Sequence, residues 1–151
     1  MSVTKSITIK TISDMKGYDI FTIKPDDSVY NAIRRFSEEN IGALLVMVED
    51  KLDGIITERD YARKVILVGK SSKKTLVKEI LTRKVIYVEL DNTIEEAMAI
   101  MTEKHIRHLP VLKDGKCVGL VSISDLIKKI ISEQDFTIEQ MTKYISGGYI
   151  S

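Results

Sequence analysis

The chain has 151 residues, 44% of them hydrophobic, which allows one compact core or two packed half-domains but not several independent domains. Its 23 basic and 22 acidic side chains nearly cancel, which argues against nucleic acid as the main partner. Cys117 is the only cysteine, so no disulfide forms within the chain. The sequence contains no Cys/His cluster of the kind that would predict a metal site. The single cysteine suits a reducing, cytoplasmic setting. The longest apolar run, residues 41–48, is too short to cross a bilayer, so we expect no membrane partner.

The first half of the chain predicts the order strand, helix, strand, strand, helix, after a short helical lead-in at residues 12–15. Apolar residues at helical spacing follow Ser28, which is a suitable N-cap for the first long helix. Asp50 lies in the turn between the last two strands, where we expect it to take a left-handed backbone conformation. The strands are expected at residues 21–23, 44–48 and 54–57, and the second helix at 58–68.

The second half predicts the same elements in the same order. Thr93 and Glu96 form a capping box at the start of its first long helix. The lead-in is expected at residues 77–80, the strands at 86–88, 109–112 and 117–122, and the second helix at 124–133. Residues 136–145 predict one more amphipathic helix, which ends before the Gly147-Gly148 pair.

This similarity is an internal repeat, because a shift of 65 residues places residues 20–66 on residues 85–131 without a gap. Identical pairs include Asp26 with Asp91, Gly54 with Gly119, and Asp60 with Asp125. The hydrophobic pattern repeats as well, so both copies should fold alike and pack against each other. We expect an α/β (α+β) protein of two β-α-β-β-α repeats related by a pseudo-twofold axis. Its expected parts are an N-terminal extension (1–10), a first domain (11–68), a linker (69–75), a second domain (76–134) and a C-terminal helix and tail (135–151).

A glycine-containing heptad marks the last strand-to-helix junction of each copy, GIITERD at residues 54–60 and GLVSISD at residues 119–125. With the segment HIRHLPV at residues 105–111, these heptads resemble the tandem cystathionine-β-synthase (CBS) domain pair over nearly the whole chain. Residues 57–75 further resemble free-standing CBS pairs of bacteria and plant mitochondria. The resemblance implies an adenine nucleotide (AMP, ATP or NAD) as a regulatory ligand, no obligatory cofactor, and a flat homodimer.

The acid and the hydroxyl of each heptad are the candidate nucleotide-binding groups. Asp60 and Asp125 follow a buried strand, where a carboxylate can accept hydrogen bonds from both ribose hydroxyls. Thr57 and Ser122, three residues earlier, can donate to phosphate oxygens beside the free N–H groups of the following helix. The alternative is that each pair is only a helix capping box, which needs no ligand.

Basic residues differ between the copies, which predicts two inequivalent sites. We expect Arg107 and His108 to bind phosphate in one site, and Arg59 and Arg63 to bind it in the other or across the central cleft. For the two first-copy arginines the alternative is a solvated helix face. The adenine needs an apolar slot, for which Ile23, Val88 and Pro110 are candidates, although each is also an ordinary core residue.

These residues predict a regulatory binding module with no catalytic residue, in which a bound nucleotide shifts the conformation seen by an unidentified protein partner. One alternative is an interaction protein that needs no ligand, and another is a nucleotide-processing enzyme. No Ser-His-Asp arrangement, phosphate-binding glycine loop or cluster of metal-binding carboxylates is recognisable in the sequence, which disfavours the enzyme.

Overall fold

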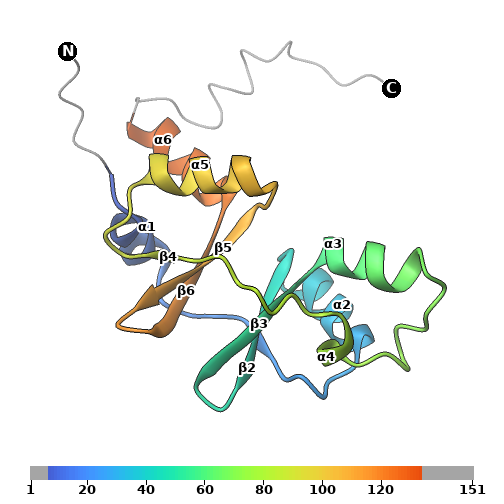
Figure 1. Ribbon diagram of the computed structural model, residues 1–151. Helices are drawn as coiled ribbons and strands as arrows, with labels where there is room; N and C mark the ends of the chain where they lie inside the picture. Colours follow the sequence, from blue (N-terminus) through green and yellow to red (C-terminus); the bar gives the residue numbers. More distant parts are fainter. Residues whose placement is uncertain (1–6, 134–151) are drawn as a thin grey trace, which may run out of the picture.

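The computed structural model describes residues 7–133 and contains two packed units side by side (Figure 1). The first unit comprises residues 21–82, and the second comprises residues 7–16 and 86–133. The first unit contains β1 (Thr22–Ile23), α2 (Val29–Glu38), β2 (Ala43–Val48), β3 (Lys51–Thr57), α3 (Glu58–Tyr61), the π-helical η1 (Ala62–Ile66) and α4 (Val77–Ile80). The second contains α1 (Ile9–Lys16), β4 (Val88–Glu89), α5 (Ile94–Lys104), β5 (His108–Lys113), β6 (Lys116–Ser122) and α6 (Ile123–Glu133).

Each unit has a three-stranded sheet, and the two sheets share one topology. The strand orders are β1-β2-β3 and β4-β5-β6, with the first pair parallel and the second antiparallel. Val46 pairs with Gly54 just before an irregularity in the ladder, and Val111 pairs with Gly119 at the equivalent place. The repeat read from the sequence and the mixed α+β fold are therefore confirmed down to strand register.

The helix starts follow the predicted caps. Ser28 Oγ accepts a hydrogen bond from Asn31 N, and Thr93 and Glu96 form the complete capping box. The second helix of the first half differs from its prediction, because α3 passes after four residues into the wider turn of η1 and ends at Ile66 rather than at residue 68. The predicted helix at residues 136–145 lies outside the described residues.

The prediction for the first hairpin turn was wrong at Asp50. In both hairpins the first turn residue has a positive φ, 57° at Glu49 and 51° at Asp114, and in the second hairpin Gly115 follows with φ 80°. The two-residue turn between Val48 and Lys51 thus places the left-handed conformation one residue earlier than expected.

The two helical lead-ins are exchanged between the units. Ile9 and Ile12 of α1 lie in the core of the second unit, whereas Val77 and Ile80 of α4 lie in the core of the first. Backbone hydrogen bonds fix both positions, from Ile9 N to Asn92 O and from Val77 N to Asp27 O, each 2.8 Å. Each unit therefore takes in a helix that precedes the other repeat in the sequence. Among the described residues, no helix combines the length and apolar character needed to span a membrane.

Candidate functional site

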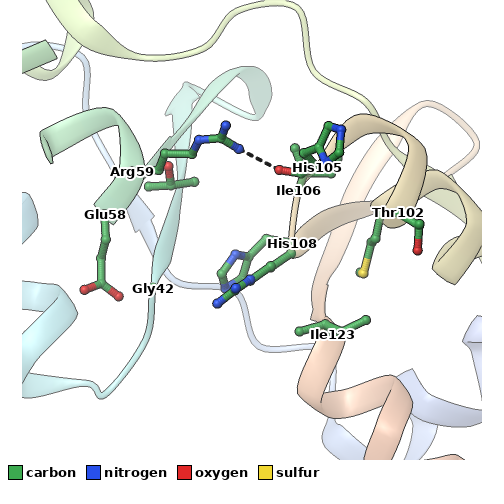
Figure 2. A pocket seen from close by; sticks show the side chains of 11 residues that line it. Gly42, Glu58, Arg59, Thr102, His105, Ile106, His108 and Ile123 are labelled. Carbon is green, nitrogen blue, oxygen red and sulfur yellow. Dashed lines mark hydrogen bonds between the residues drawn. The ribbon is translucent and has the colours of Figure 1, made fainter. Parts of the chain in front are cut away.

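A cavity of about 730 Å³ opens at the joint between the two units (Figure 2). The first unit contributes the start of β2 and the β3–α3 junction, and the second contributes the C-terminal end of α5 and the starts of β5 and α6. The lining residues are Gly42, Thr57, Glu58, Arg59, Met101, Thr102, His105, Ile106, Arg107, His108 and Ile123. Four of the residues predicted from the sequence are thereby brought together, namely Thr57, Arg59, Arg107 and His108.

Arg59 reaches across the joint from the first turn of α3. Its Nη1 donates a hydrogen bond of 2.6 Å to the carbonyl oxygen of His105 (Figure 2). His105 is the C-cap of α5 and has a left-handed backbone, with φ 55° and ψ 44°. The guanidinium thus lies at the negative end of a helix dipole, where a cation is stabilised.

The imidazole of His108 lies against the backbone of Gly42 in the other unit. A side chain at residue 42 would place its Cβ 3.2 Å from His108 Cε1 and 3.0 Å from Glu58 Oε1, so glycine leaves room for both groups. Burial lowers the pKa of His108, and the positive charges of Lys16 and Arg107 lower it further, against the opposing effect of Asp125. The imidazole is therefore neutral at pH 7 and can both donate and accept a hydrogen bond.

Asp60 is buried and fully engaged within the first unit. Its Oδ2 accepts hydrogen bonds from the backbone N and the hydroxyl of Thr57, which completes a capping box. Its Oδ1 accepts from the Thr82 hydroxyl at 3.1 Å and from Lys64 Nζ at 2.9 Å. The capping role considered as an alternative from the sequence is thus present at this junction, and the side chain is only 10% exposed.

Asp125 occupies the same repeat position in a more open setting. Its Oδ2 accepts from Ser122 N and from Lys16 Nζ, each at 2.8 Å, while Lys16 also donates to the carbonyl oxygen of Leu120. Partial burial opposes ionisation, but the hydrogen bonds from Lys16 and Ser122 outweigh it and lower the pKa of Asp125. Ser122 Oγ accepts from Asp125 N, so this junction is also capped.

The remaining candidate residues lie outside the cavity. Ile23 and Val88 are core residues of the first and second unit, respectively, and Pro110 is buried within β5. Arg63 is exposed on η1. The apolar side chains that line the cavity are instead Met101, Ile106 and Ile123, which the sequence analysis did not select as site residues.

A second cavity of about 740 Å³ is related to the first by the repeat, and it lies within the first unit. It is lined by Phe36, Ser37, Asn40, Ile41, Gly42 and Glu58, and the residues 65 positions later all line the first cavity. Ile33, Tyr61 and Ala62 complete this second cavity. Among the described residues that line it, Glu58 carries the only charge. The two cavities are therefore lined by equivalent positions of the repeat but differ in the charged residues at those positions.

Comparison with known proteins identifies the class of this two-unit fold. The model of the CBS domain family matches residues 9–67 and 77–132. The "CBS domain-containing protein CBSX3, mitochondrial" of Arabidopsis thaliana is 43% identical over 154 residues, covering 96% of this chain and 75% of the relative.

Two solved structures extend the comparison. A putative signal-transduction protein with CBS domains from Burkholderia ambifaria MC40-6 has a TM-score of 0.82 and 51% identity, covering 87% of this chain and 98% of that one. The CBS domain pair of protein MJ0100, solved in complex with 5'-methylthioadenosine and S-adenosyl-L-methionine, has a TM-score of 0.69 and 26% identity, covering 87% of this chain and 100% of that one. The chain belongs to the CBS domain family and is a CBS-pair regulatory module.

Proposed function

We propose that this CBS pair binds an adenine nucleotide such as AMP, ATP or NAD at the joint between its units, and that binding changes the conformation presented to a protein partner. The observation that carries the proposal is the first cavity, which gathers Arg59, Arg107 and His108 from both units around one space. Its volume of about 730 Å³ is in the range of small-molecule sites. The adenosine ligands of the related MJ0100 pair support the ligand class.

The polar side of the cavity suits a phosphate. Two guanidinium groups can each offer paired N–H donors to phosphate oxygens, and such charge-assisted contacts are stronger than neutral hydrogen bonds. The Thr57 hydroxyl at the start of α3 can donate to a phosphate only after it turns away from Asp60 Oδ2. Met101, Ile106 and Ile123 offer an apolar surface on which a base can rest.

The ribose is assigned to the acids of the two heptads, with Asp125 as the stronger candidate. The hydrogen bonds and the ion pair of Asp125 described above use Oδ2, so Oδ1 can accept a ribose hydroxyl without a change in the cap. At Asp60 both oxygens are engaged, and a ribose would have to displace Thr82 or Lys64. Ser122 would assist phosphate binding at the second junction only after Ser122 Oγ turns from its cap.

We further propose that the module acts by binding alone and that it forms a homodimer. Val65 and Leu126 on the second helices are fully buried inside their own units, so they are not dimer contacts. Exposed apolar residues are better candidates for dimer contacts, namely Ile66 and Leu67 at the end of η1 and Ile127 within α6. Light scattering on the purified protein measures the mass directly. With Cys117 as the only cysteine, a reducing compartment such as the cytoplasm suits the chain.

A thermal-shift panel tests the proposed function. AMP, ATP, NAD, 5'-methylthioadenosine and S-adenosylmethionine are each added at increasing concentration, and a ligand at 100 times its dissociation constant should stabilise the fold by about 2.7 kcal/mol. Product analysis of the same mixtures detects turnover. No shift with any of these ligands would favour the ligand-independent interaction protein, and turnover of a nucleotide would favour an enzyme.

A further inference from the structure

One hydrogen bond joins the two units in the part of the chain that the structure describes. It runs from Arg59 Nη1 to the carbonyl oxygen of His105. The other hydrogen bonds and ion pairs of residues 7–133 stay within one unit or involve its connecting segments. The rest of the joint consists of packing, including the contact of β3 with β6 and of Gly42 with His108. In the described residues, a single guanidinium therefore makes the hydrogen bond that connects the two units.

This guanidinium also lines the first cavity, and so does its acceptor. Arg59 is exposed, and its bond to His105 uses one of the five N–H donors of the guanidinium. Arg107 and His108 line the same cavity from the second unit. His108 points into the joint in Figure 2. An anion that enters between these groups therefore meets the residue that links the units.

The carbonyl oxygen and a phosphate compete unequally for Arg59. A backbone carbonyl is neutral and accepts one hydrogen bond here, whereas a phosphate carries full charge and can accept two parallel N–H bonds from a guanidinium. The helix dipole of α5 strengthens the carbonyl as an acceptor, but only by the partial charge of a helix end. A phosphate within reach should therefore take the guanidinium from His105.

We propose that Arg59 is a phosphate-operated link between the two units. Without ligand, Arg59 holds the C-terminal end of α5 and keeps the joint closed. A phosphate in the cavity binds Arg59, frees the His105 carbonyl and lets the units move. The inference rests on the proposed function and deepens it, because it names the residue through which occupancy reaches the joint.

The link makes the response specific for the phosphate. A ligand shifts a conformational equilibrium only by its difference in affinity for the two states. A phosphate-bearing nucleotide gains Arg59 in the released state and therefore favours it. Adenosine, which has no phosphate, gains nothing from the release and leaves the joint closed even when it is bound.

Pulsed electron paramagnetic resonance can measure the joint directly. Spin labels are placed at Lys51→Cys and Lys116→Cys, which are exposed, equivalent in the repeat and distant from the cavity-lining residues, in a Cys117→Ser background. The distance distribution is recorded without ligand, with AMP and with adenosine, and calorimetry establishes occupancy. Arg59→Ala removes the link. Arg34→Ala is the matched control, since Arg34 pairs with Glu38 on the surface of α2.

We expect AMP to shift or broaden the distribution of the parent protein and adenosine to leave it unchanged. Ligand-free Arg59→Ala should already show the AMP-bound distribution, and AMP should add nothing to it, whereas Arg34→Ala should behave as the parent. A parent-like distribution in ligand-free Arg59→Ala would overturn the link whether or not a ligand binds. Binding of AMP with no change in the joint would also overturn it. Absence of AMP binding would count instead against the proposed function for that nucleotide.

Discussion

At the scale of single residues, Asp60 and Asp125 hold the same repeat position with different capacity for a ligand. Asp125 has 20% of its side chain exposed and an oxygen free of the contacts described, so Asp125→Ala should weaken AMP binding by about 1.5–3 kcal/mol. Asp60→Ala removes four hydrogen-bond contacts around α3 and should mainly lower the free energy of unfolding. Calorimetry and urea denaturation on both variants measure the two effects. Equal loss of affinity in both variants would contradict the asymmetry.

The two heptad glycines offer a second residue-scale comparison. A Cβ at Gly54 would lie 2.6 Å from the carbonyl oxygen of Thr82 and would also clash with Leu81, whereas a Cβ at Gly119 finds Val111 at an ordinary 3.7 Å. Gly54→Ala should therefore destabilise the fold by about 1–3 kcal/mol through overpacking. Gly119→Ala should be neutral or slightly stabilising, because alanine suits a strand better than glycine. Thermal melting of the two variants decides, and equal melting temperatures would contradict the prediction.

At the scale of elements, the exchanged lead-in helices determine which unit each one stabilises. Ile9 is fully buried in the core of the second unit, so Ile9→Ala should cost about 2–5 kcal/mol in urea denaturation. Met15 on the same helix is 68% exposed, and Met15→Ala should change the stability by less than about 0.5 kcal/mol. Hydrogen exchange should show the loss of protection within residues 86–133. Loss confined to residues 21–82 would mean that α1 stabilises the first unit instead.

The sequence predicts these elements better than it predicts their partners. Periodicity and caps located the strands, the starts of the long helices and the lead-ins, because burial and capping are local demands. The amphipathic pattern of a lead-in helix, however, indicates only that one face is buried. Nothing in residues 9–16 indicates in which of the two cores that face is buried. The same limit applies to the cavity. Arg107 and His108 were found through a motif, whereas Met101 and Thr102 line the cavity because the end of α5 faces α3 across the joint.

At the scale of the whole molecule, the repeat creates two cavities of similar volume, and their charges distinguish them. Arg59 and Arg107 line only the first cavity, whereas Glu58 lines both cavities and is the only charged residue among the described residues that line the second. Because of the two arginines, a nucleotide phosphate should bind the first cavity more tightly than the second. We expect AMP titration by calorimetry to give one strong site per chain, with any second site weaker by about tenfold or more, the worth of one charge-assisted hydrogen bond.

Arg107 carries most of this difference between the cavities, because its repeat equivalent in the first half is Gly42. Arg107→Ala should therefore remove the strong site and leave the weak one, while the control Arg34→Ala should retain both. Two identical and independent AMP sites in the parent protein would contradict the predicted difference in affinity between the cavities. That result would mean that the repeat symmetry of the fold, and not the charges placed on it, governs where the nucleotide binds.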